Sequence, residues 1–148
     1  MNTLLKGRGI FIVDASLIPI FGMLLFSGLK LHGAAHLNNH DIWHNWAVIH
    51  VISSILCLIA MFLHIKAHWN WYKSIFRNGV RKKSKITVSV SVFFVASVVT
   101  GLILLLFIEG ENSGMGLWHY KISLIWVALV LIHTIKRFKI MVKGLKRK

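Results

Sequence analysis

Residues 86–108 read ITVSVSVFFVASVVTGLILLLFI, a run that contains no charged side chain. A helix that crosses the hydrocarbon core of a bilayer needs about 20 apolar residues, so this run predicts a transmembrane helix. Three further runs have the same character, at residues 10–31, 47–65 and 117–135. The 148 residues are therefore expected to form a single membrane domain, an all-α bundle of four transmembrane helices with up-down topology.

Basic residues lie in blocks at the ends of these runs. The chain has 18 Lys and Arg against 4 Asp and Glu, and its formal net charge is +14. Because cytoplasmic loops carry the excess of Lys and Arg, both termini and the loop between the second and third spans are expected in the cytoplasm. The localisation predicted from this pattern is a multi-pass protein of the bacterial inner membrane. The same charges predict attraction to anionic lipids and not to nucleic acid, because they are confined to the ends of the spans.

Several classes of site are excluded by what the sequence lacks. Cys57 is the single cysteine, so there is neither an internal disulfide nor a multi-cysteine zinc site. There is no G-x-G-x-x-G for a dinucleotide and no C-x-x-C-H for covalent haem. The run 10–31 is longer than the apolar part of a signal peptide, roughly 7–15 residues, so it is expected to remain as the first span.

Four of the nine histidines lie inside the expected spans, where ionisable side chains are rare and usually functional. The second span contains His50 and His64, and the fourth contains His119 and His133, so that the two members of each pair are 14 residues apart. Fourteen residues make nearly four helical turns, which puts both histidines on about the same side, about 21 Å apart along the axis. Both spans run from outside to inside, so His50 is expected at the depth of His119, and His64 at the depth of His133.

Two depth-matched pairs of histidines predict two bis-histidine haems. A haem iron takes one imidazole on each axial side, which two facing helices of a bundle can supply. The cofactors expected are two haem b, an outer one on His50 and His119 and an inner one on His64 and His133. No internal repeat is evident. Small residues of the first and third spans are expected to let the flat macrocycles approach the backbone: Gly22, Ser27, Gly28, Ser97, Thr100 and Gly101.

The motifs around these histidines resemble those of a known family. They are WHNWAVIH and FLHIKAHWNW in the second span, and LWHYK and LIHTIKR in the fourth. With these motifs the chain is similar to the short bacterial four-helix dihaem b-type cytochromes, which include cytochrome b561-like proteins and respiratory-dehydrogenase cytochrome b subunits. It looks most like the four-helix group that accompanies flavinylated extracytoplasmic electron carriers. The resemblance covers nearly the whole chain and implies the family's fold, haem type and role in electron transfer.

Other histidines are alternative ligands. His68 lies one turn beyond His64 and could replace it, but it would break the matched depth with His133; otherwise it is an interfacial group or a hydrogen-bond donor to a ligand. His44 and His32 are alternatives to His50 for the outer haem. His44 precedes His50 by six residues, which turns it to another side of the helix, so His50 is preferred.

The histidines before His50 follow one another at four-residue steps, at positions 32, 36, 40 and 44. Gly33, Asn38, Asn39 and Asp41 make a continuous helix through this segment doubtful, so these histidines are expected in the extracytoplasmic loop or at the ends of the spans. His36 and His40 are expected to lie outside the bundle interior. They either surround a docking surface as solvated groups or, together with Asp41, bind zinc or copper.

Asp14 is an acid four residues into an apolar run. It is either an interfacial or N-cap group for the helix from Ala15 onward, or an acceptor for a quinol proton near the inner haem. Five basic residues are candidate partners of haem propionates, although orientation alone would explain the last three: Lys30, Lys121, Lys66, Lys136 and Arg137.

The function predicted from these patterns is transmembrane electron transfer through two haems. The electrons would pass between the quinone and quinol pool and a partner redox protein, either extracytoplasmic or cytoplasmic. An alternative from another class is a haem-free membrane protein that binds or transports metal with its outer histidines. A third hypothesis is a transmembrane reductase of ferric or cupric ions.

Overall fold

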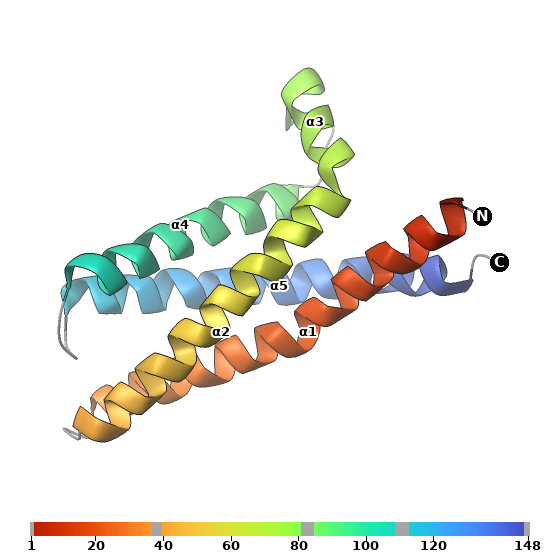
Figure 1. The fold of residues 1–148 in the computed structure, drawn as a ribbon. Coiled ribbons are helices and arrows are strands. Elements are labelled where there is room, and N and C mark those ends of the chain that lie inside the picture. The colour runs from red at the N-terminus through yellow and green to blue at the C-terminus, as the bar shows by residue number, and fades with distance from the viewer. Residues whose placement is uncertain (1, 37–39, 81–84, 109–112, 147–148) are drawn as a thin grey trace.

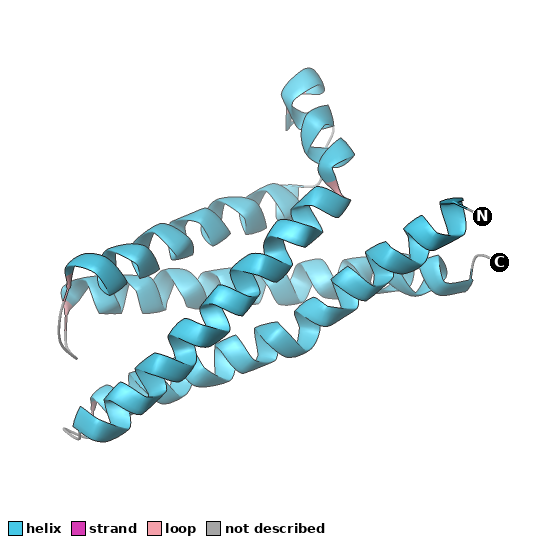
Figure 2. Cartoon of the chain, viewed as in Figure 1, coloured by secondary structure: helices cyan, strands magenta, loops and turns pink. Residues whose placement is uncertain are grey.

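The computed structural model of the chain describes residues 2–36, 40–80, 85–108 and 113–146. These residues form helices joined by short connections, and no strand occurs among them (Figure 2). The five helices are α1 (Asn2–Ala35), α2 (His40–Ala67), α3 (Trp69–Asn78), α4 (Lys85–Phe107) and α5 (Gly114–Lys146).

Four of the helices are long and apolar enough to cross a membrane, by their length and composition. The stretches concerned are Arg8–Ala35, His40–Ala67, Lys85–Phe107 and Gly114–Val142. Large hydrophobic side chains on these helices, such as Phe62 and Leu106, point away from the rest of the protein. An all-helical, multi-pass membrane protein is therefore confirmed, and the helices extend beyond the predicted spans except at Ile108, which follows the end of α4.

The long helices pair into two hairpins. α1 packs along α2, α4 packs along α5, and the two hairpins meet through α1 and α5. Both termini lie at the right-hand end of the molecule in Figure 1. The end of α1, the start of α2, the end of α4 and the start of α5 lie at the left-hand end. α2 and α5, which carry the histidine pairs, therefore run in the same direction.

The short helix α3 is an element that the sequence analysis placed in a loop. α2 ends at Ala67, His68 forms a turn, and α3 then points away from the four long helices (Figure 1). The hydroxyl of Tyr72 on α3 lies 3.2 Å from Ser91 Oγ on α4. α3 ends at Gly79, which adopts a positive φ of 69° and donates its N–H to the Ile75 carbonyl at 2.8 Å.

The buried centre of the bundle contains Cys57, Val90 and Trp126. The Trp126 ring packs against Phe21, with centroids 5.4 Å apart, and against Phe94, with centroids 5.5 Å apart. Cys57 lies seven residues from both histidines of α2, and Trp126 lies seven residues from both histidines of α5. The aromatic centre is therefore midway, along each histidine helix, between the positions of the outer and inner histidines.

Candidate cofactor site

The outer histidines, His50 of α2 and His119 of α5, face each other across the two hairpins. Their ring centroids are 6.4 Å apart and their planes are inclined at 76°. One metal held between two imidazoles by bonds of about 2.0–2.1 Å to each nitrogen separates the ring centroids by about 6 Å. The structure thus brings together the predicted outer pair at the spacing that a shared metal centre requires.

Hydroxyl groups from the neighbouring helices determine which nitrogen of each outer ring carries its proton. Ser27 Oγ donates to the Leu24 carbonyl at 3.0 Å, and Thr100 Oγ1 donates to the Ala96 carbonyl at 2.9 Å. With its only proton so used, each hydroxyl oxygen accepts from an imidazole: His50 Nδ1 lies 3.1 Å from Ser27, and His119 Nδ1 lies 2.9 Å from Thr100. Nδ1 therefore bears the hydrogen in both rings, which leaves the Nε2 lone pair available for a metal.

Two glycines make room for these rings. A Cβ atom on Gly28 would lie 3.1 Å from His50 Cε1, and one on Gly101 would lie 3.2 Å from His119 Cε1. Gly22, by contrast, has nothing within 4 Å of such an atom. The small residues were expected to admit flat macrocycles to the backbone, and the structure shows instead that Gly28 and Gly101 admit the imidazole rings.

A cavity of about 870 Å³ adjoins the outer pair. Both His50 and His119 line it, together with Gly28, Gly101 and Trp126. The remaining lining is mainly apolar, and the volume is in the range of cofactor and ligand sites, about 300–1,000 Å³. Trp126 Nε1 is buried in this wall without a hydrogen-bond partner among the described residues, so the wall offers one donor to a bound group. The donor set and the cavity fit a flat, largely apolar cofactor with a metal at its centre.

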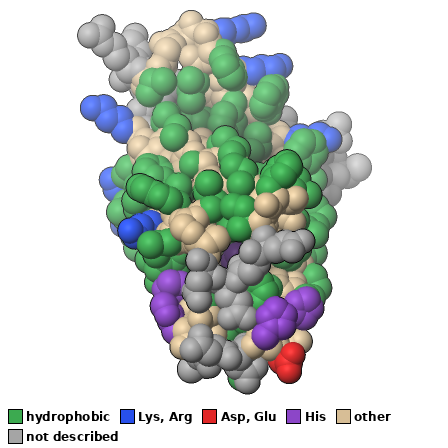
Figure 3. Space-filling view, turned by 90° about the vertical axis from the view of Figure 1, so that its left-hand side faces the viewer, with side chains coloured by type: hydrophobic (Ala, Val, Ile, Leu, Met, Phe, Trp, Pro, Cys, Tyr) green, Lys and Arg blue, Asp and Glu red, His purple; other side chains and the backbone are tan. Residues whose placement is uncertain are grey.

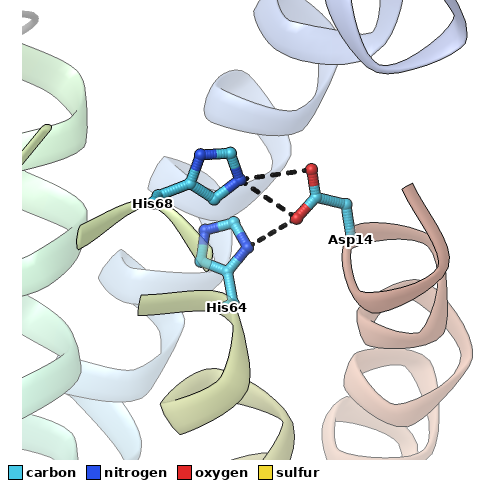
Figure 4. A group of neighbouring side chains, drawn as sticks. All are labelled: Asp14, His64 and His68. Atoms are coloured by element: carbon cyan, nitrogen blue, oxygen red, sulfur yellow. Dashed lines mark hydrogen bonds and ion pairs between the residues drawn. The ribbon is translucent and has the colours of Figure 1, made fainter. Parts of the chain in front are cut away.

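The inner end contains a cluster of three side chains, Asp14, His64 and His68 (Figure 4). Asp14 Oδ1 lies 2.8 Å from His64 Nδ1 and 3.2 Å from His68 Nε2, and Asp14 Oδ2 lies 3.4 Å from the same His68 atom. Because an ionised carboxylate can only accept, His64 Nδ1 is the donor, and its Nε2 is again left for a metal. One ligand atom from each residue lies within 4.8 Å of the others, so the three could themselves hold an ion.

Asp14 is not the N-cap residue that was one of its two interpretations. α1 begins at Asn2, twelve residues earlier, so the backbone around Asp14 is already helical and has no N-terminus to cap. Its carboxylate reaches across to α2, where the turn at His68 brings a second imidazole beside His64, with 4.7 Å between the ring centroids.

His133 completes the four predicted ligands. Its Nδ1 lies 3.4 Å from Thr87 Oγ1 of α4, and the ring is close enough to His64, His68 and Asp14 to interact with them electrostatically. The structure thus brings the inner histidines into one region, whereas direct ring contact between facing helices is seen for the outer pair.

The acceptors reveal an internal repeat that the sequence analysis missed. Each hairpin has one helix with two acceptors, 13 residues apart, and one helix with two histidines, 14 residues apart. A shift of 73 residues takes four positions of α1 onto α4: Asp14, Phe21, Ser27 and Gly28 become Thr87, Phe94, Thr100 and Gly101. A shift of 69 residues takes α2 onto α5: His50, Cys57 and His64 become His119, Trp126 and His133. The signal was present in the equal spacings, but it is visible only once the hairpins are paired.

Two of the outer histidines lie nearer the interior than expected. His32 stacks on Tyr120 with ring centroids 3.8 Å apart, and His36 packs edge-on against His32 at 5.1 Å. Both line the cavity beside the outer pair. The expectation that His36 lies outside the bundle interior is therefore wrong: α1 continues as a helix to Ala35, which carries His36 to the cavity wall.

His40 and His44 are exposed on the first turns of α2, and their rings stack with centroids 6.2 Å apart. Figure 3 looks onto this end of the molecule, where histidine side chains gather at the surface. The exposure of His44 removes it from the position of an outer ligand. Asn38 and Asn39, which were expected to interrupt the helix, lie outside the described residues.

The basic residues proposed for propionates lie on the outside of the helices. Lys30 Nζ is 5.6 Å from the Phe26 ring, and Lys121 Nζ is 5.7 Å from the Trp118 ring. The side chains of Lys66, Lys136 and Arg137 are exposed. Among the described residues, the polar groups that line the cavity next to the outer pair are thus histidines, hydroxyls and Tyr120, not these lysines.

The chain matches no known protein-family model, no curated protein sequence and no solved structure. What the site can do is therefore argued from its own residues.

Proposed function

We propose that this protein transfers electrons across a membrane through two bis-histidine b haems, as a short bacterial four-helix dihaem cytochrome. The observation that carries the proposal is the outer site: His50 and His119 lie 6.4 Å apart at a cavity of about 870 Å³, and each Nδ1 is engaged by a hydroxyl. His64 and His133 form the second site, with Asp14 and Thr87 in the corresponding places.

The ligand chemistry of the chain supports haem over a bare ion at the outer site. Two neutral imidazoles suit an axial pair, and a cavity with a mostly apolar lining suits a macrocycle. When bound, haem supplies one-electron chemistry, while the protein supplies position and electrostatics. Ser27 and Thr100 hold the rings in one tautomer, and Gly28 and Gly101 allow them to lie against the helices.

The proposed topology has both termini and α3 in the cytoplasm of a bacterium, with the chain spanning its inner membrane four times in up-down order. Lys73 and Arg77 on α3 and Lys136 and Arg137 on α5 lie towards the same end as the termini, and Lys and Arg mark the cytoplasmic side. These side chains would also contact anionic lipids. The proposed partners are the quinone pool and a redox protein on one side of the membrane.

Purified protein tests the proposal directly. Reduced-minus-oxidised spectra are expected to show b-type bands, and extracted haem measured against protein is expected to give two haems per chain. A colourless preparation from haem-replete cells would contradict the proposal, and one haem per fully loaded chain would remove one histidine pair.

A second candidate function is haem-free metal binding, and the structure favours a different place for it than the outer histidines. Asp14, His64 and His68 offer three ligand atoms within 4.8 Å of one another, a combination that suits zinc. A colourless preparation that contains one zinc per chain, lost in the His68→Ala variant, would support this function over electron transfer.

A further inference from the structure

The four proposed ligands differ in what their Nδ1 atoms face. Three face neutral hydroxyls, those of Ser27, Thr87 and Thr100. The fourth, His64, faces the carboxylate of Asp14 at 2.8 Å. The internal repeat makes this a difference at one place, since the residue of α4 that corresponds to Asp14 is the uncharged Thr87.

We propose that Asp14 sets the reduction potential of the inner haem below that of the outer haem, so that a single electron in the protein rests at the outer site. This inference rests on the proposed function. A carboxylate that accepts the Nδ1 hydrogen makes the imidazole a more basic ligand, and its negative charge stabilises the more positive, ferric iron. Asp14 touches the ligand and not the metal, so it is a positioning residue.

The surroundings of Asp14 hold its charge in place. Only 18% of its side chain is exposed, and His68 donates from Nε2 towards both carboxylate oxygens, at 3.2 and 3.4 Å. Figure 4 shows the two imidazoles on the same side of the carboxylate. Half-buried charges are screened less by salt than exposed ones.

Basic side chains near the inner site act in the opposite direction. Arg137 lies near His133, and Lys66 follows His64 by two residues. Both are exposed, so water and lipid headgroups screen their charges, whereas Asp14 contacts the ligand ring at hydrogen-bond distance. The carboxylate is therefore expected to dominate.

The inequality of the two sites gives the proposed electron transfer a preferred direction. The exchange between the sites is of one electron: the inner iron passes from ferrous to ferric as the outer iron passes from ferric to ferrous, and no bond is made or broken. An electron that enters at the cytoplasmic side is thus drawn outward, towards the end that carries His36, His40 and His44.

The test is a potentiometric titration of the purified, full-length protein, followed in the haem spectra. Asp14→Asn keeps the shape and an accepting oxygen but removes the charge. We expect the inner midpoint potential to rise by about 59 mV, a tenfold change in the electron distribution, while the outer potential stays unchanged. The same substitution in a His50→Ala background, which retains only the inner haem, identifies the haem that shifts.

Thr87→Ser is the matched control, because it keeps a neutral hydroxyl beside His133 and should move neither potential. Asp14→Glu restores the charge and should keep the inner potential below the outer one, which a merely structural role would not require. An unshifted inner haem in Asp14→Asn, or an inner potential at or above the outer one in Asp14→Glu, overturns the inference while the two haems still establish the proposed function. If the wild-type protein holds no haem, the proposed function itself fails.

Discussion

At the scale of single residues, the outer site depends on groups that never reach a metal. Ser27 is fully buried, and its hydroxyl connects the Leu24 carbonyl of its own helix to His50 of the next one. Thr100 does the same for His119. A histidine placed by helix geometry alone could turn about its side-chain bonds or exchange tautomers, and these two hydroxyls remove both freedoms.

The ligand assignment predicts the outcome of four single substitutions. His50→Ala and His119→Ala should each abolish the same, outer haem and halve the haem content, because an iron with one axial imidazole loses half of its protein ligands. His64→Ala and His133→Ala should each abolish the inner haem. Haem content and low-temperature spectra of each variant measure this. Loss of the inner haem in His68→Ala together with its retention in His64→Ala would reassign the inner ligand.

The glycines allow a matched pair of substitutions on α1. Gly28→Ala places a Cβ 3.1 Å from His50 Cε1, so the ring must move and the outer haem should bind about 10–100-fold more weakly. Gly22→Ala, where nothing lies within 4 Å, should leave haem binding unchanged. Alanine favours helix over glycine by about 1 kcal/mol at either site, so helix propensity predicts no loss. Haem retention during dialysis distinguishes the two variants, and equal retention would mean that the contact at Gly28 is unimportant.

At the scale of elements, hydropathy was sufficient for the four long helices, since each has an apolar run of membrane length. The 14-residue spacing was also sufficient to place two histidines on one side of a helix. The partner of Asp14 was beyond such reasoning, because His64 lies 50 residues away and the contact depends on how α1 and α2 pack. His68 and α3 were missed because the break after Ala67 lies in a segment rich in basic and aromatic residues, which read as a loop.

The position of α3 can be tested by cysteine labelling, because Cys57 is the sole native cysteine and is only 3% exposed. Arg77→Cys, on α3, should be protected from a membrane-impermeant maleimide in intact spheroplasts and labelled after lysis. Asn45→Cys, exposed near the start of α2, should be labelled in both. Wild-type protein, with its buried thiol, is the unlabelled control. The reverse pattern would invert the proposed topology.

At the scale of the whole molecule, the two hairpins meet through α1 and α5, and the cavity lies between them beside the outer pair. Each proposed haem takes one ligand from each hairpin, so the cofactors are also the main links across this interface. The repeat that underlies the arrangement escaped sequence analysis because matched positions share chemistry and not identity: Asp14 corresponds to Thr87, and Cys57 corresponds to Trp126.

Haem is therefore expected to stabilise the bundle as a whole. A ligand at 1,000 times its dissociation constant adds about 4 kcal/mol to the stability of the state that binds it. Protein from haem-limited cells should unfold at a lower temperature in detergent than haem-replete protein, and His50→Ala/His119→Ala should lie between the two. Coincident unfolding curves for depleted and replete protein would show that the hairpins associate without help from the cofactor.

The division of each histidine pair between the hairpins also has a consequence in time. His50 and His119 are 69 residues apart in the chain, which a ribosome adding about 5–20 residues per second covers in about 3–14 s. Throughout that interval the first hairpin already contains Ser27 and Asp14, which orient its two imidazoles, but each imidazole has no opposite partner. The nascent protein thus passes through a stage with two prepared half-sites, and α5, the last helix to leave the ribosome, is the one that closes both.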